Sequence, residues 1–165
     1  IWAWSGGRIK KIKRAVSHML VIFPFEEAIY RAAGVPVTYI GHPLAEMIPL
    51  APDVAAARGT LGIAQDARVV TIMPGSRMGE LKYLAEPFVA AAKILARRDP
   101  GLVFIAPMAG ERQRAYYTEI VSKAGLADVP VRLVDGQSHA AIAAADAVLV
   151  ASGTATLEVL SLIHI

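Results

Sequence analysis

The sequence predicts a doubly wound α/β fold, in which helices cover both faces of a parallel sheet. Two observations carry the prediction. Beyond residue 53, short apolar runs alternate with longer helical patterns, and the connections between them are short. The runs 68–73 (RVVTIM) and 147–151 (AVLVA) are almost entirely apolar, as expected of strands buried on both faces. The 165 residues, 55% of them hydrophobic, suffice for one domain and part of another.

The composition argues against several classes of protein. There are no cysteines, which removes disulfides, thiolate catalysis and cysteine-bound zinc. No apolar run reaches the roughly 18 residues that span a bilayer, and we expect no signal peptide. The net charge is +3, but five of the 17 basic residues lie in one segment, 8–14 (RIKKIKR). A general nucleic-acid-binding protein carries its charge more widely, so we expect no nucleic-acid partner.

The first part of the chain predicts a strand at 17–23, a helix at 26–33 and a strand at 35–40. Gly34 is placed to end the helix. Prolines 43, 49 and 52 indicate a linker. The predicted divisions are a first domain (1–43), a linker (44–52), a second domain (53–160) and a short tail (161–165).

The second domain predicts alternating helices and strands. Asp53 and Ser138 are the candidate N-caps of their helices, and Gly62 and Gly125 the candidate C-terminal residues. Pro87 is placed at the first position of a helix, because an interior proline removes a hydrogen bond and costs about 3 kcal/mol. The predicted elements are a helix at 54–61, a strand at 68–73, a helical turn at 80–85, a helix at 87–98, a strand at 102–106, a helix at 111–124, a strand at 131–134, a helix at 138–145 and a strand at 147–151.

Two polar, glycine-containing loops are expected to lie side by side. Numbered from residue 68, the four strands of a doubly wound sheet commonly pair in the order 3-2-1-4, which makes the first and fourth strands neighbours. The loop after the first is 74–77 (PGSR), and the loop after the fourth is 152–154 (SGT). Ligands bind such sheets outside the carboxyl ends of the strands, at this switch point.

The chemistry of the two loops suits a diphosphate with a ribose beyond it. Backbone N–H groups at a helix N-terminus attract anions, glycine allows close approach, and an arginine offers a bidentate cation. Glu158, one helical turn after the second loop, is placed to accept hydrogen bonds from a ribose diol. The candidate ligand-binding residues are Gly75, Ser76, Arg77, Ser152, Gly153, Thr154, Thr156 and Glu158.

Simpler interpretations remain open for each loop. Residues 152–154 fit an ordinary helix cap, and Arg77 fits a surface ion pair with Glu80. No GxGxxG, P-loop or GxSxG motif is present, which disfavours a dinucleotide site, a P-loop nucleotidase and a hydrolase elbow. The four histidines lack metal-ligand spacing, so we expect neither a metal nor another cofactor.

The start of the chain combines aromatic and basic residues. Trp2 and Trp4 precede Lys10, Lys11 and Lys13. Tryptophan rings at headgroup depth and cations on anionic lipid are typical of a membrane-surface segment. A solvated loop or helix beside a buried tryptophan pair is the competing interpretation, because Ile9 and Ile12 make only a thin apolar face.

Taken together, the motifs of this chain resemble the lipid-A-disaccharide synthase family of bacterial glycosyltransferases. The resemblance covers about residues 1–160. It rests on WAW near the start, FPFE at 23–26, GHP at 41–43, PGSR at 74–77 and SGTATLE at 152–158, in this order and spacing.

The resemblance implies a GT-B fold, with a doubly wound Rossmann-like sheet in residues 53–160 and the tail end of a similar, acceptor-binding domain in 1–43. It implies transfer of 2,3-diacylglucosamine from UDP to 2,3-diacylglucosamine 1-phosphate at the cytoplasmic face of the inner membrane, without a metal. Arg77 would then meet phosphate, and SGTATLE would hold diphosphate and ribose. Arg77 and the helix dipole would stabilise the leaving diphosphate.

The chain lacks most of the acceptor half expected from the resemblance, including the region of the proposed catalytic acid. We therefore expect the polypeptide alone to be inactive and name no catalytic residue. The tail 161–165 (SLIHI) does not look like the family's continuation, and we expect it to be an artefact. Two alternatives stay open: another GT-B enzyme acting on UDP-GlcNAc-like substrates, and a non-catalytic module that binds nucleotide or membrane.

Overall fold

The computed structural model describes residues 7–43, 51–125 and 131–162. Trp2 and Trp4, most of the predicted linker and the end of the predicted tail lie outside these ranges. The chain forms two compact units, Ile1–Ile48 and Pro49–Ile165. The boundary between them falls within the range 44–52, where the prolines predict a linker.

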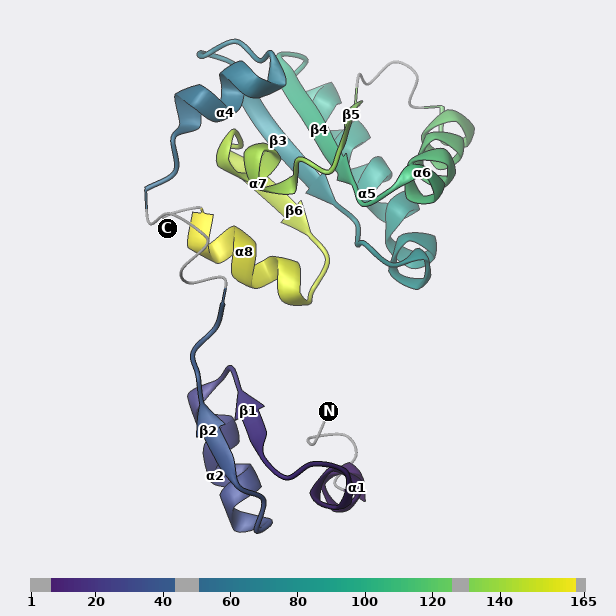
Figure 1. Ribbon diagram of the computed structural model, residues 1–165. Coiled ribbons are helices and arrows are strands. Elements are labelled where there is room, and N and C mark those ends of the chain that lie inside the picture. Colours follow the sequence, from purple (N-terminus) through teal and green to yellow (C-terminus); the bar gives the residue numbers. More distant parts are fainter. Residues whose placement is uncertain (1–6, 44–50, 126–130, 163–165) are drawn as a thin grey trace. The chain divides into compact units, whose positions relative to one another are not determined.

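The first unit is a parallel β-α-β arrangement preceded by a basic helix (Figure 1). Met19 lies opposite Val37 in the two-stranded sheet. The predicted strands 17–23 and 35–40 are both present, but each is shortened to three paired residues. The elements are α1 (Gly7–Ala15), β1 (Met19–Val21), α2 (Pro24–Ala32) and β2 (Val37–Tyr39).

A small core holds this unit together. Val21, Tyr30 and Val35 are buried, and Ile12 of α1 packs against them. The ammonium of Lys13 donates a hydrogen bond of 3.1 Å to the carbonyl oxygen of Ala33, at the end of α2. A cation at this position complements the negative end of the helix dipole. The basic helix α1 is thus attached to the rest of the unit through one face.

The second unit contains a four-stranded parallel sheet in the order β5-β4-β3-β6 (Figure 1). This is the predicted order 3-2-1-4, so the doubly wound prediction is confirmed. The elements are α4 (Val54–Leu61), β3 (Arg68–Met73), α5 (Met78–Arg98), β4 (Leu102–Met108), α6 (Glu111–Lys123), β5 (Val131–Asp135), α7 (Ser138–Ala143), β6 (Ala147–Val150) and α8 (Thr154–Leu162).

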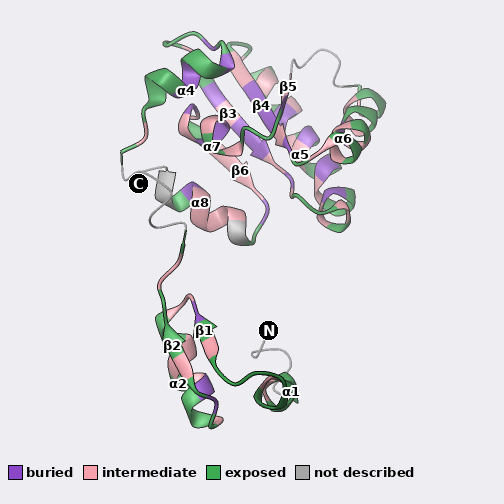
Figure 2. Ribbon diagram, viewed as in Figure 1, coloured by how far each residue is buried: buried purple, intermediate pink, exposed green. Residues whose placement is uncertain are grey.

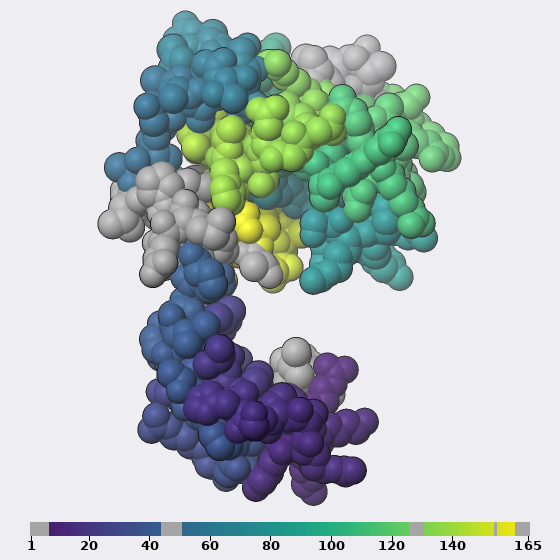
Figure 3. Space-filling model, viewed as in Figure 1, coloured from purple at the N-terminus to yellow at the C-terminus, as the bar shows by residue number. Residues whose placement is uncertain are grey.

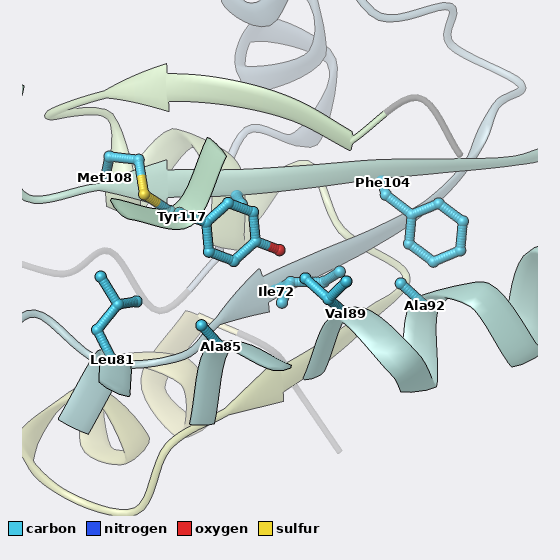
Figure 4. Close-up of a cluster of buried hydrophobic side chains, with 9 residues drawn as sticks. Ile72, Leu81, Ala85, Val89, Ala92, Phe104, Met108 and Tyr117 are labelled. Carbon is cyan, nitrogen blue, oxygen red and sulfur yellow. The ribbon is translucent and has the colours of Figure 1, made fainter. Parts of the chain in front are cut away.

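Helices cover both faces of this sheet. Successive strand residues point to opposite sides, and apolar side chains on both sides pack against helices. Figure 2 shows how much of β3 and β4 is buried. Ile72 and Phe104 pack against α5 and α6 on one face, as Figure 4 shows, together with the buried Tyr117. Val69 and Ile105 pack against α4 and α7 on the other face. Burial raises the pKa of the Tyr117 hydroxyl well above its usual range.

One predicted boundary is wrong. Pro87 does not begin a helix, because α5 runs without interruption from Met78 to Arg98. Leu81, Ala85 and Val89 on the two sides of the proline are all buried, and each turn of helix adds apolar area to the core. Pro87 itself is exposed, so water can donate a hydrogen bond to the carbonyl oxygen that the proline, lacking an N–H, leaves without a donor. Burial therefore outweighs the local cost of the proline.

A second helix boundary also differs from the prediction. Ser138 is the first residue of α7 rather than its N-cap, a position taken by Gln137. The carbonyl oxygen of Gln137 accepts the first helical hydrogen bond, from Ala141, at 2.9 Å. The other predicted caps are confirmed: the Asp53 carboxylate accepts from the N–H of Ala56, and Gly62 has a left-handed backbone.

The amino-terminal edge of the sheet is held by a buried arginine. Arg58 of α4 is 7% exposed and donates to the carbonyl oxygens of Ala144 and Gln65 at 3.1 and 2.5 Å. It also pairs with Asp146, whose carboxylate accepts the N–H of Val69 at 2.7 Å. This cluster joins α4, β3 and the start of β6.

Candidate functional site

A cavity of about 360 Å³ opens at the carboxyl edge of the sheet in the second unit. In the space-filling view, α8 (yellow) and the start of α5 (teal) lie along this side of the unit (Figure 3). Its lining includes Met73 and Met108, the last residues of β3 and β4, and Ala151, the residue after β6. The polar residues that line it are Ser76, Arg77, Glu80, Ser138, Ser152 and Glu158. Both predicted loops therefore contribute to one cavity.

The loop after β3 folds tightly over the start of α5. Gly75 has φ +117°, a region that other residues rarely adopt, and a Cβ there would lie 2.6 Å from Cβ of Glu80. The Glu80 carboxylate accepts the backbone N–H of Arg77 at 3.3 Å and the Arg77 guanidinium at 3.1 Å. Ser76 is tethered through its carbonyl oxygen, which accepts from Gln113 of α6 at 3.0 Å.

Arg77 thus forms the ion pair with Glu80 that its sequence spacing also allowed. Its side chain is 83% exposed, and both residues line the cavity. An exposed ion pair is worth only about 0.2–1 kcal/mol, so the guanidinium can be drawn to a stronger anionic partner at small cost. The ion pair and a ligand-binding role are therefore compatible.

The loop after β6 leads directly into α8. Ser152 and Gly153 are exposed and line the cavity. The hydroxyl of Thr156 accepts the N–H of Gly153 at 3.3 Å, and the N–H of Thr156 donates to the Gly153 carbonyl oxygen at 3.1 Å. Thr156 is not among the described residues that line the cavity, and its hydroxyl closes the turn. Thr154 begins α8, and its side chain lies outside the described part.

Glu158 lies where an acceptor for a ribose diol is predicted. Its side chain is 22% exposed and lines the cavity. Its neighbour His139 on α7, whose Nε2 lies 3.6 Å from the carboxylate, had no predicted role. Ser138, beside it, lines the cavity as well. The predicted strand order could have pointed to Ser138 and His139, since the loop that follows strand 131–134 must lie at the same edge of the sheet.

The balance of charge in the cavity narrows the possible ligands. Arg77 and the backbone N–H groups at the first turn of α8 attract an anion. Glu158 adds a carboxylate that can accept hydrogen bonds from hydroxyl groups, whereas the Glu80 carboxylate already accepts from Arg77. A molecule with a phosphate at one end and a diol at the other matches this distribution. Among the described residues, no group of histidines and carboxylates could hold a metal ion.

A second cavity, of about 440 Å³, adjoins the same edge between β4 and β5. It shares Met108 and Ala109 with the first. Its arginine, Arg114, contacts Asp135 at 2.9 Å, and Glu111 adds a second carboxylate to its wall. Among the described residues, none from the loop after β6 or from α8 lines this second cavity.

The candidate membrane-surface residues belong to the first unit. Lys10 and Lys11 of α1 are exposed, whereas the ammonium of Lys13 is engaged by the end of α2. Trp2 and Trp4 lie outside the described residues. None of the helices in the described ranges has the length and apolar character needed to cross a membrane.

Comparison with known proteins identifies the family. The family model described as lipid-A-disaccharide synthetase (LpxB) matches residues 1–164. Proteins named lipid-A-disaccharide synthase from Aromatoleum aromaticum, Bordetella petrii and Cupriavidus pinatubonensis are 51%, 53% and 51% identical over 96% of this chain. The chain spans 40%, 42% and 39% of their lengths. The chain therefore belongs to the lipid-A-disaccharide synthetase family.

Proposed function

We propose that the full-length protein containing this chain transfers 2,3-diacylglucosamine from UDP to 2,3-diacylglucosamine 1-phosphate, forming lipid A disaccharide and releasing UDP. One observation carries the proposal beyond family membership. Two loops separated by 74 residues or more in the sequence meet at one cavity, with an arginine, a helix N-terminus and a carboxylate around it. This set matches the phosphate and ribose of a nucleotide.

In this proposal the residues divide between the two ends of UDP. Gly75, Ser76 and Arg77 meet the diphosphate from one side, and Ser152, Gly153 and Thr154 meet it from the other. Thr156 holds the second loop in shape through its contact with Gly153. Glu158 accepts from the ribose hydroxyls.

Negative charge grows on the diphosphate as the glycosidic bond to UDP breaks. Arg77 and the N–H groups of α8 stabilise that charge, which lowers the barrier to departure of UDP. Residues 53–160 act as the nucleotide-sugar domain, and 1–43 belong to the acceptor-binding domain. The group that activates the acceptor is assigned to no residue of this chain.

A transfer assay tests this function. The full-length protein should convert UDP-2,3-diacylglucosamine and 2,3-diacylglucosamine 1-phosphate to disaccharide and UDP, detected by mass spectrometry. Turnover of UDP-GlcNAc without the lipid acceptor would instead indicate an epimerase or a non-lipid transferase. Binding of UDP without turnover of any of these substrates would indicate a non-catalytic module.

We further infer that the enzyme acts at the cytoplasmic face of the inner membrane, where its acylated substrates reside. The exposed cations of α1 support a contact with anionic headgroups, since each lysine near such a surface contributes about 1 kcal/mol. Ile12 already packs on the first unit's core, so these cations rather than an apolar face of α1 provide the attraction.

Neutralising Lys10 and Lys11 together is expected to weaken binding of the full-length protein to anionic vesicles by about tenfold or more. Lys13 is left intact, because its ammonium caps α2. Sedimentation with vesicles containing phosphatidylglycerol provides the measurement. The matched control replaces Arg97 and Arg98, two exposed cations at the end of α5, with glutamine. Equal binding by the α1 variant and the parent protein would rule out this contact.

A further inference from the structure

We propose that Glu80 is an internal competitor for the diphosphate, and that its carboxylate sets the affinity for UDP. In this inference, which rests on the proposed function, the carboxylate holds the donors of the loop after β3 and gives way when the nucleotide binds. Glu80 is thus an affinity-determining residue rather than only part of a helix cap.

The geometry places the carboxylate on the donors that a phosphate would need. One oxygen accepts the guanidinium of Arg77 at 3.1 Å, and the other accepts the backbone N–H of Arg77 at 3.3 Å. The carboxylate is folded against the loop, since a Cβ added to Gly75 would lie 2.8 Å from Oε2 of Glu80. A phosphate that approaches Arg77 from the cavity therefore meets an anion already in place.

The position of Glu80 indicates that its carboxylate competes with the diphosphate for Arg77 rather than orienting Arg77 toward the ligand. A carboxylate that merely orients an arginine lies behind it, away from the ligand. Glu80 instead lines the cavity itself, together with Arg77. Its negative charge would face the diphosphate across a short distance, and like charges in one site repel.

The free energies of these interactions allow the nucleotide to displace Glu80 from Arg77. The Arg77–Glu80 pair is exposed and joins residues three apart on one helix start, a class of pair worth little. A diphosphate carries more negative charge than one carboxylate, and it can accept hydrogen bonds from both Arg77 and the N–H groups of α8. The carboxylate thus lowers the affinity without preventing binding. This effect also favours release of UDP after transfer.

Replacing Glu80 with glutamine is the test. Glutamine retains a side-chain oxygen for the Arg77 N–H, so the helix start should be preserved, as thermal unfolding can verify. Calorimetry on the full-length protein should show UDP binding that is about two- to fivefold tighter, the range set by an exposed ion pair. Uridine, which has no diphosphate, should bind the parent protein and Glu80→Gln equally.

The control is Glu86→Gln, the same change at an exposed site farther along α5 and away from the residues that line the cavity. Unchanged or weaker UDP binding by Glu80→Gln, equal tightening of uridine, or equal tightening in the control would each overturn the inference. In these cases the proposed function stands if the parent protein binds UDP. A parent protein that does not bind UDP would overturn both.

Discussion

Replacing Arg58 with alanine is expected to destabilise the second unit by about 3 kcal/mol. The side chain is 7% exposed and serves the carbonyl oxygens of Ala144 and Gln65, which would both lose their donor. Asp146 would keep only its bond to the N–H of Val69 among these contacts. Because Asp146 is 56% exposed, water can solvate its charge, which keeps the loss below that of a fully buried pair.

The matched control is Arg68→Ala at the exposed ion pair with Asp99. The Arg68 side chain is 64% exposed, so its loss should cost less than about 1 kcal/mol. Urea unfolding of the full-length variants, followed through hydrogen exchange of β3 amides, gives the comparison. If Arg58→Ala proved no more destabilising than Arg68→Ala, the buried cluster would not hold the sheet edge.

Replacing Arg77 with alanine is expected to weaken UDP binding by about 10- to 100-fold. The change removes the cation that meets the diphosphate and leaves Glu80 unpaired in the cavity wall. Arg77→Lys should lose less affinity for UDP, since lysine keeps the positive charge but lacks the planar guanidinium that binds phosphate with two hydrogen bonds. Calorimetry with UDP and with uridine separates the diphosphate from the nucleoside, and only UDP should respond.

Arg112→Ala is the control for Arg77. Arg112 is an exposed arginine in the first turn of α6, and it does not line the cavity beside Arg77. Its removal makes the same change in net charge and should leave the affinity for UDP nearly unchanged. Similar losses in the two variants would mean that UDP senses the overall charge rather than Arg77.

The sheet could be predicted because its signals are local. Apolar strands such as 68–73 and the glycines that end the helices are legible in sequence, and the order β5-β4-β3-β6 follows from the common topology. From that order, it also follows that the loops 74–77 and 152–154 meet at one edge of the sheet, where Ser152 and Gly153 line the same cavity as residues 75–77. The approximate position of the candidate site could therefore be predicted from the sequence.

One wrong boundary and one unpredicted contact depend on tertiary packing. Pro87 stays inside α5 because burial of Ala85 and Val89 extends the helix through it, which no local propensity reports. His139 of α7 lies 3.6 Å from Glu158 of α8, a contact between two helices that local sequence spacing does not report. Thr156 differs, because its hydroxyl accepts the N–H of Gly153 within the same turn, a local contact that sequence spacing alone could not distinguish from a ligand contact.

A crystal structure of the full-length protein with UDP would test the central claim most directly. The diphosphate is predicted to lie between residues 74–77 and the first turn of α8, with Arg77 turned from Glu80 toward phosphate. The ribose hydroxyls should lie within hydrogen-bond distance of Glu158. UDP bound in the second cavity, beside Arg114 and Asp135, or away from this edge of the sheet, would contradict the assignment.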